Sequence, residues 1–235
     1  MKKILRKFVS KFGKYSLIYE NAFDLIKTIN LHKIELIVDV GASTGKYGKM
    51  LRRFGYRNYI FSVEPVSESF KKLNFNCSSD KKWTAKQCIV SSENKKKIKI
   101  NVSKDYDNSS LLNVTDLHLK NYKGAEFLHS EEIESKTLDD LINDEIEKKK
   151  NMMLKIDTQG SEGDILRSGN QSIDKFKLIQ VELSIQKLYA NQNMWIEIIN
   201  FMRERNFDVW NIIPGYKKKD IGQLYQFDAI FYKLN

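Results

Sequence analysis

The sequence has little cysteine, proline or histidine. Its two cysteines, Cys77 and Cys88, cannot form a disulfide scaffold, and they are not clustered as zinc ligands would be. This scarcity favours a reducing compartment, and we expect a cytoplasmic protein. The three histidines are scattered without an H-x-H or H-E-x-x-H pattern, so we expect no metal site.

Long apolar runs are also missing from the chain. No stretch approaches the roughly 18 apolar residues that a membrane-spanning helix requires. Apolar residues at 41% and charged residues at 30% are ordinary values for a folded protein. A chain of 235 residues is long enough to form a substantial core. The composition therefore predicts a soluble globular protein and excludes a disordered or fibrous chain.

Arginine is scarce in spite of a net charge of +10, because only 7 of the 40 basic residues are arginine. Arginine supplies the bidentate contacts to phosphate and guanine that dominate nucleic-acid-reading surfaces. Lysines spread through a chain are more typical of solvated faces. The composition therefore disfavours a nucleic-acid partner. Only the positive net charge favours RNA as an alternative substrate.

Residues 1–35 differ from the rest of the chain. Five apolar residues between Ile4 and Phe12 share one helical face, and basic residues cover the other faces. This pattern is typical of a helix that packs on the main domain, or of one that contacts the inner face of a membrane weakly through residues 1–14. Lys11 and Lys14 interrupt the apolar stretch, which excludes a secretory signal. We expect a basic helical extension followed by one domain over residues 36–235.

From residue 36 onward, short apolar runs alternate with amphipathic segments. Helical spacing is clear from Tyr47 to Phe54 and from Trp195 to Met202. This alternation predicts an α/β fold with a mainly parallel, doubly wound sheet and helices on both faces. Only a loop joins the last two expected strands, so we expect them to form an antiparallel hairpin at the end of the sheet. The expected strands are 36–40, 59–64, 85–90, 152–157, 178–183, 207–213 and 228–232.

Residues 93–136 break this alternation. A β-like stretch at 97–102 is followed by polar residues, and 118–134 has no clear periodicity. Long irregular insertions in compact domains usually carry function or are mobile. We therefore expect a substrate loop here, and His118 and His129 within it are either bases or solvated side chains.

A glycine loop follows the first expected strand and precedes a helix, with the sequence Val38-Asp39-Val40-Gly41-Ala42-Ser43-Thr44-Gly45. The dinucleotide fingerprint would need glycines at positions 43 and 46. A P-loop would need four residues between its glycines. The pattern that remains, an acidic strand end before G-x-x-x-G, is that of S-adenosylmethionine (SAM) enzymes. A carboxylate suits SAM because this cofactor carries an ammonium and a sulfonium, and glycine lets the backbone approach it closely.

Glu64 ends the next expected strand and lies 23 residues after Gly41. A carboxylate at about this spacing accepts hydrogen bonds from both ribose hydroxyls of a nucleotide-type ligand. Pro65 then ends the strand, because proline has no backbone donor. The predicted cofactor-binding residues are Asp39, Gly41, Ala42, Ser43, Gly45, Tyr47, Glu64 and Pro65.

With these motifs the chain resembles the FkbM family of SAM-dependent methyltransferases over roughly residues 36–232. The resemblance implies a Rossmann-like methyltransferase fold and O-methylation of hydroxyls, often on sugars of glycans or natural products. The chain departs from the family pattern at Ser43, where Asn is frequent, and at Thr158-Gln159, which replace an aliphatic and an acidic residue. The matched segments are Asp39-Val40-Gly41-Ala42, Glu64-Pro65, Thr137-Leu138-Asp139-Asp140-Leu141, Leu154-Lys155-Ile156-Asp157 with Gly160 and Glu162, and Gln226-x-Asp228-Ala229-x-Phe231.

Methyl transfer to a hydroxyl requires alignment of the acceptor and a base. Ligands of an open α/β sheet lie beyond the carboxyl ends of the strands, where the strand order reverses. Asp157 stands at such an end, and Lys155 lies two residues earlier on the same strand face. The predicted catalytic residues are Asp157, Lys155, Glu162 and Glu182. Each has a structural alternative: a turn cap for Asp157, a partner of that carboxylate for Lys155, a helix N-terminal charge for Glu162 and a buried hydrogen-bond network for Glu182.

Together these features predict a SAM-dependent O-methyltransferase that acts on a saccharide or a related small acceptor, in surface-glycan or natural-product biosynthesis. An RNA ribose methyltransferase and a non-catalytic SAM-binding scaffold are the alternatives. The chain lacks the Asp/Asn-Pro-Pro-Tyr motif of amine methylation and the Pro-Cys nucleophile of pyrimidine methylation, because Val66 and Gly215 follow its two prolines. The sequence indicates no oligomeric state.

Overall fold

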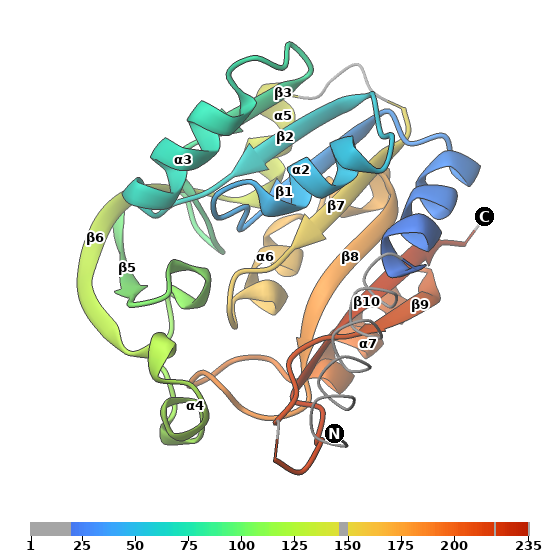
Figure 1. The fold of residues 1–235 in the computed structure, drawn as a ribbon. Coiled ribbons are helices and arrows are strands. Elements are labelled where there is room, and N and C mark those ends of the chain that lie inside the picture. Colours follow the sequence, from blue (N-terminus) through green and yellow to red (C-terminus); the bar gives the residue numbers. More distant parts are fainter. Residues whose placement is uncertain (1–19, 146–149, 219, 235) are drawn as a thin grey trace, which may run out of the picture.

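The computed structural model describes residues 20–145, 150–218 and 220–234, so the basic segment 1–14 lies outside the described residues. Within them, seven strands form the main sheet in the order β3-β2-β1-β7-β8-β10-β9 (Figure 1). All neighbours pair in parallel except β10, which runs antiparallel to β8 and to β9. The strands are β1 Leu36–Val40, β2 Tyr59–Val63, β3 Trp83–Lys86, β7 Met152–Ile156, β8 Phe176–Ser184, β9 Phe207–Pro214 and β10 Gln226–Lys233. The predicted Rossmann-like sheet with a C-terminal antiparallel hairpin is confirmed.

Helices cover both faces of the main sheet (Figure 1). Every residue of β1 and β7 is buried, as expected for parallel strands that are covered on both sides. One face packs against the helix of residues 20–31 and against α2 and α3, and the other packs against α5, α6 and α7. These helices are α2 Lys46–Arg53, α3 Ser67–Cys77, α5 Leu138–Glu145, α6 Glu162–Ser168 and α7 Trp195–Glu204.

The helix of residues 20–31 is part of the core. Leu25, Ile26 and Ile29 are buried in the same apolar cluster as Ile37 of β1 and Ile230 of β10. The described end of the N-terminal extension therefore packs on the sheet. Among the described residues, no helix has the length and apolar character needed to cross a bilayer.

The insertion at 93–136 is folded, which corrects the expectation of an irregular segment. Strands β5 and β6 form a long antiparallel ribbon, and β4 pairs with β6 in parallel. The ribbon extends from the main sheet, and α4 lies at its far end (Figure 1). Charged residues, such as Lys99 and Glu132 opposite each other, occupy much of the ribbon, and β6 lacks the apolar alternation of a half-buried strand. These elements are β4 Ile89–Val90, β5 Lys95–Ser103, α4 Asp116–Asn121 and β6 Phe127–Lys136.

The prediction of one strand over residues 85–90 is also wrong, because the chain passes from the main sheet to the smaller sheet within this range. β3 ends at Lys86 in the main sheet, and β4 belongs to the smaller sheet. Between them, the Gln87 amide donates to the Pro65 carbonyl and to Ser67 Oγ, each at 3.0 Å. The side chain of Gln87 therefore binds the start of α3 at the point where the backbone stops pairing with β2.

Candidate functional site

The carboxyl ends of β1, β2 and β7 meet at one edge of the main sheet, because Val40 lies opposite both Val63 and Ile156. Gly41 follows β1 with φ of +81°, and its amide donates to the Val63 carbonyl at 3.0 Å. A Cβ atom at this position would lie 1.8 Å from the Asp157 carbonyl oxygen. Only glycine satisfies both the positive φ and this close approach.

Glu64 is buried at the end of β2 and holds the glycine loop. Its Oε2 accepts a hydrogen bond from the Ser43 amide at 2.8 Å, and its Oε1 accepts one from the Val66 amide at 2.9 Å. Burial raises the pKa of Glu64 to about 7, although the two backbone donors oppose that rise. A carboxylate has about four lone-pair positions, so two of them stay available to a ligand.

A cavity opens between the glycine loop, Glu64 and the insertion. The charged side chains among its described lining residues are all acidic, namely Glu64, Asp107 and Asp157. Apolar side chains, including Val66, Ile89 and Ile100, line another part. A ligand with a positive charge and an apolar or aromatic part suits this lining. Pro65 also lines the cavity.

Asp107, which sequence reasoning missed, connects the insertion to the glycine loop. Its Oδ1 accepts a hydrogen bond from Ser43 Oγ at 2.6 Å, and Lys46 donates to its Oδ2. Some 60 residues separate these partners in the chain, and the sequence carries no signal for their contact. The insertion therefore closes one side of the cavity.

A second, wider hollow adjoins the first. Gly41, Ser43, Asp107, Asp157 and Gln159 line both, so a group bound in one lies next to a group bound in the other. Four more of the predicted site residues line the second hollow, namely Ala42, Tyr47, Lys155 and Glu182. Two adjoining cavities of this kind suit a cofactor and an acceptor.

A row of polar side chains crosses the sheet beneath α2. Asp39 lies opposite Lys155, and Lys155 lies opposite Gln180, whose Oε1 accepts a hydrogen bond from the Tyr47 hydroxyl at 2.8 Å. The Lys155 ammonium is 3.9 Å from Asp39 Oδ1 and 3.1 Å from Asp157 Oδ2. Burial raises the pKa of Asp39 to about 6, and the neighbouring carboxylates raise the pKa of Lys155. Lys155 is therefore a buried cation between two carboxylates.

One amide bridges two predicted catalytic carboxylates. Gln159 Nε2 donates to Asp157 Oδ1 at 3.0 Å and to Glu182 Oε2 at 2.8 Å. The Tyr189 hydroxyl is 3.1 Å from Gln159 Oε1, which fixes the orientation of that amide. Burial and the charge of Asp157 raise the pKa of Glu182 well above its usual range.

Glu162 binds the loop that carries these groups. Its carboxylate accepts hydrogen bonds from the backbone amides of Thr158 at 2.9 Å and of Gly160 at 3.0 Å. Glu162 lines neither of the two cavities, and Gly45 does not line them either. In the structure, Glu162 therefore stabilises the loop that follows β7.

The two histidines of the insertion occupy different environments. His118 is 2% exposed and lines the second hollow, whereas the His129 side chain is 54% exposed and lies 3.6 Å from Glu131. Sequence reasoning left the two histidines undistinguished, because the helix α4 that buries His118 has no clear apolar period.

Replacing Glu64 by Ala tests the cofactor site. Loss of hydrogen bonds to a charged acceptor costs about 1.5–3 kcal/mol, so we expect Glu64→Ala to weaken SAM binding roughly 10- to 150-fold. In the wild type, SAM affinity should rise as the pH rises through about 7, because the carboxylate must be ionised to accept both ribose hydroxyls. Calorimetry between pH 6 and pH 8 measures both effects.

The matched control is Glu68→Ala, which removes an exposed carboxylate from the neighbouring helix α3. It should keep the wild-type affinity. A Glu64→Ala protein with wild-type SAM affinity would contradict the assignment of Glu64.

Comparison with known proteins gives one family. Residues 39–209 match the family model described as the methyltransferase FkbM domain. A curated relative, the 2-O-methyltransferase NoeI of Sinorhizobium fredii, is 23% identical over 163 residues. That match covers 67% of this chain and 66% of NoeI, so the chain spans slightly less than two thirds of the length of this relative.

Solved structures give further similarities. A putative RNA methyltransferase from Pyrococcus horikoshii aligns with a TM-score of 0.47 at 14% identity, over 92% of this chain and 85% of that one. Fibrillarin from Aeropyrum pernix, solved with bound S-adenosylmethionine, aligns with a TM-score of 0.45 at 7% identity, over 84% of this chain and 66% of that one.

Proposed function

The chain belongs to the FkbM family of methyltransferases, and on that premise we propose that it methylates a hydroxyl of a saccharide or a related small acceptor. It is a SAM-dependent methyltransferase. Bound SAM supplies an electrophilic methyl group on a positively charged sulfur. The acidic lining of the first cavity and the unused lone pairs of Glu64 fit this cofactor. The 2-O-methyltransferase activity of NoeI supports transfer to oxygen.

One observation carries the catalytic part of the proposal: the Asp157 carboxylate lies in the wall that both cavities share. Lys155 holds its Oδ2 and Gln159 holds its Oδ1, at 3.1 and 3.0 Å. Its side chain is 34% exposed, which leaves it accessible to an acceptor hydroxyl. We assign to Asp157 the removal of the hydroxyl proton, which is worth about 10²- to 10⁴-fold in rate.

The neighbouring groups complete this assignment. Burial and the charges of Asp157 and Asp228 raise the pKa of Glu182 well above its usual range, which disfavours an ionised Glu182 beside Asp157. Lys155 and Gln159 position the base, and Glu162 holds the loop after β7. The proposed function therefore has one base, Asp157, and three positioning residues.

A transfer assay tests this function. The purified chain is incubated with SAM carrying a labelled methyl group and with a panel of glycosides, oligosaccharides and total RNA. We expect the label to appear as a methyl ether on a glycoside, at the same rate with and without EDTA. Label on RNA ribose would contradict the saccharide acceptor, and SAM binding without transfer to any acceptor would favour a non-catalytic scaffold. Loss of transfer on chelation with recovery by Mg²⁺ would contradict a base-only mechanism.

A further inference from the structure

Three rings form one wall of the second hollow: His118 of α4, Tyr122 directly after α4, and Tyr216 after β9. We call them the aromatic wall. The ring centroids of His118 and Tyr122 are 6.5 Å apart at an interplanar angle of 28°, and those of His118 and Tyr216 are 6.1 Å apart at 34°. The rings are thus turned in similar directions. They come from segments almost 100 residues apart in the chain.

The aromatic wall is held in place before any ligand binds. The Thr115 hydroxyl donates to the Leu188 carbonyl at 3.0 Å and accepts from the His118 amide, which ties the start of α4 to the main domain. The Tyr122 hydroxyl donates to Asp105. Behind the wall, Tyr189 meets the His118 ring edge-on at 5.3 Å. A rigid wall of this kind loses little conformational entropy on binding.

The aromatic wall is also uncharged. His118 is 2% exposed, and its Nδ1 has no hydrogen-bond partner among the described residues. Burial lowers the pKa of His118, so the ring is neutral near pH 7. Aromatic faces carry partial negative charge and attract the partly positive C–H groups of a sugar ring.

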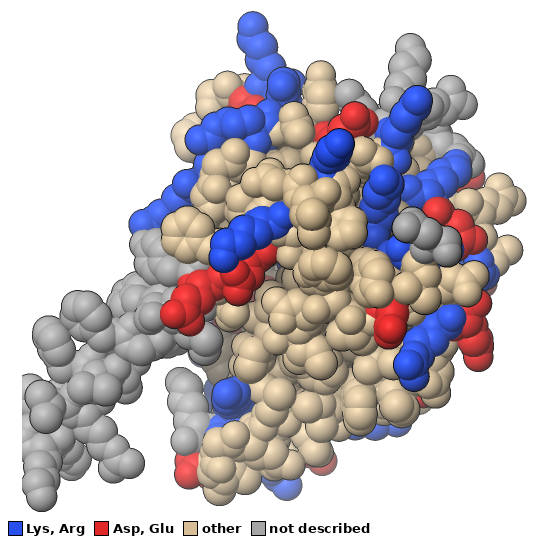
Figure 2. All heavy atoms as spheres, turned by 90° about the vertical axis from the view of Figure 1, so that its right-hand side faces the viewer, with Lys and Arg blue, Asp and Glu red and all other residues tan. Residues whose placement is uncertain are grey.

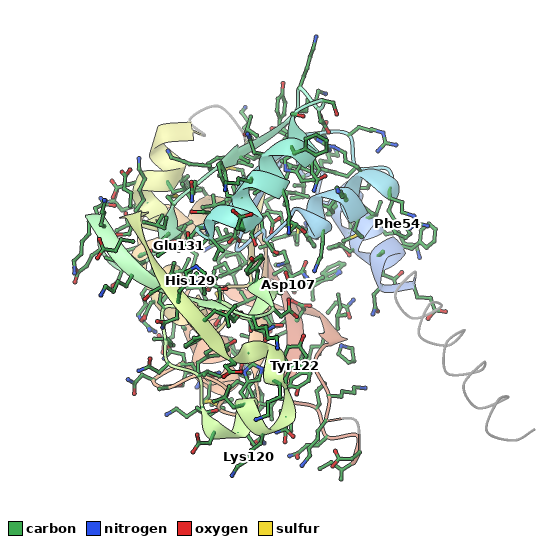
Figure 3. The ribbon with its side chains drawn as sticks, turned by 60° about the vertical axis from the view of Figure 1, so that its left-hand side comes forward. Phe54, Asp107, Lys120, Tyr122, His129 and Glu131 are labelled. Carbon is green, nitrogen blue, oxygen red and sulfur yellow. The ribbon has the colours of Figure 1, made fainter. Side chains whose placement is uncertain are left out.

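The charges around the aromatic wall disfavour an anionic acceptor. Two lysines line the second hollow, and each is already paired, Lys46 with Asp107 and Lys155 with Asp157. Asp105 adds a further carboxylate to the lining, and Glu182, whose pKa is raised by burial, adds no cation. A phosphate or carboxylate on the acceptor would therefore meet net negative charge. Figure 3 shows Asp107 and Tyr122 on the insertion, and Lys120 of α4 at the far end of the insertion.

Neutral hydrogen-bonding groups complete the lining. Asn108 and Gln226 contribute amides, which can both donate and accept, as the hydroxyls of a sugar do. On the described face that Figure 2 shows, Lys and Arg side chains are interspersed with Asp, Glu and neutral areas, unlike the continuous basic track of a nucleic-acid surface. The lining of the hollow thus favours a neutral acceptor that carries hydroxyls.

We propose that the aromatic wall is the acceptor subsite, and that it takes an uncharged sugar ring stacked on Tyr122 and Tyr216 while excluding acceptors that carry a phosphate or carboxylate. This assignment rests on the function proposed above. It adds the residues that bind the acceptor and the charge class of that acceptor.

Ligand-detected NMR tests the subsite, with S-adenosylhomocysteine filling the cofactor cavity. The test compounds are the methyl glycosides of glucose, galactose, mannose and fucose, and those of glucuronic and galacturonic acid. At least one neutral glycoside should bind, and the glycosides of glucuronic and galacturonic acid should both bind at least tenfold more weakly than it does. Failure of all four neutral glycosides to bind, or equal binding of the uronic acids, would overturn the proposal.

Variants connect the binding to the aromatic wall. Tyr122→Ala should weaken the bound glycoside about tenfold and leave S-adenosylhomocysteine affinity unchanged, because one stacked ring is lost. Tyr59→Ala is the matched control: Tyr59 is 40% exposed against 39% for Tyr122, and it lies at the amino end of β2, away from the hollow. The control should bind as the wild type does. If Tyr122→Ala binds the glycoside with wild-type affinity, the aromatic wall is not the acceptor subsite.

The same variants separate this subsite from the proposed function. A neutral glycoside that binds in a Tyr122-dependent way but receives no methyl group supports the subsite and contradicts the function. Methyl transfer to a sugar that is unchanged in Tyr122→Ala supports the function and contradicts the subsite. A short RNA hairpin that competes with the glycoside would contradict the exclusion of anionic acceptors.

Discussion

Asp157→Asn is expected to reduce kcat/KM for the acceptor by about 10²-fold or more, with SAM affinity nearly unchanged. The substitution keeps the side-chain shape but removes the base, and general base catalysis contributes about 10²- to 10⁴-fold. Cofactor binding should persist because Glu64 and the glycine loop provide it. Single-turnover methyl transfer, calorimetry with SAM and thermal melting on the same protein measure all three quantities.

The structure also predicts a modest loss of stability in Asp157→Asn. Lys155 and Gln159 each donate to one carboxylate oxygen, so the new amide places a donor against one of these donors. An unsatisfied buried group costs about 1–3 kcal/mol, and because the Asp157 side chain is 34% exposed we expect the lower end of this range. Asp164→Asn is the control, because the exposed carboxylate of Asp164 on α6 pairs with Arg167 and lies outside both cavities. Near-normal transfer by a folded Asp157→Asn protein would remove Asp157 as the base.

Gly41→Ala is expected to abolish measurable SAM binding, which corresponds to a loss of at least 100-fold. The added Cβ would lie 1.8 Å from the Asp157 carbonyl oxygen, so the loops after β1 and β7 must separate. These loops form the wall that both cavities share. Calorimetry with SAM, on protein whose fold is checked by circular dichroism, measures the loss.

Gly55→Ala isolates the cause of that loss. Gly55 has φ of +100°, and a Cβ atom there would meet no atom within 4 Å. Gly55→Ala therefore has the backbone penalty of about 1–2 kcal/mol in stability without the steric contact, and it should bind SAM normally. If Gly41→Ala and Gly55→Ala behave alike, close approach of the backbone is not what Gly41 provides.

Local patterns predicted most of the main sheet. Buried strands such as 36–40 and 152–156 appear as short apolar runs, and the spacing of apolar residues located α2 and α7. The antiparallel end of the sheet followed from the short connection between the last two strands. These features depend on neighbouring residues only, which is why sequence reasoning could reach them.

The insertion could not be predicted in the same way. β6 is paired along one edge with charged β5 and is mostly exposed or half-buried, so its sequence carries no alternation. The change of sheet after Lys86 depends on the contact of Gln87 with Pro65, 22 residues earlier. Such pairings form only when distant segments have folded together.

The functional site also has a part that the sequence predicts and a part that it does not. The glycine loop and Glu64 stood out by spacing, because they lie on adjacent parallel strands. Asp107, Gln159 and the aromatic wall did not, since each has a partner that lies between 23 and almost 100 residues away in the chain. The side of the site that faces the acceptor is thus the less predictable side.

The pairing of Asp39 with Lys155 has a consequence for how this protein can evolve. Asp39 depends on Lys155, whereas Lys155 also pairs with Asp157 at 3.1 Å, and removing one partner of a buried pair costs about 3–5 kcal/mol. A typical domain has a margin of only 5–15 kcal/mol. A substitution of Lys155 alone would leave the fully buried Asp39 without its cation, so the fold tolerates an apolar residue at position 155 only when Asp39 is replaced as well. Among descendants of a common ancestor, we expect these two positions to change together.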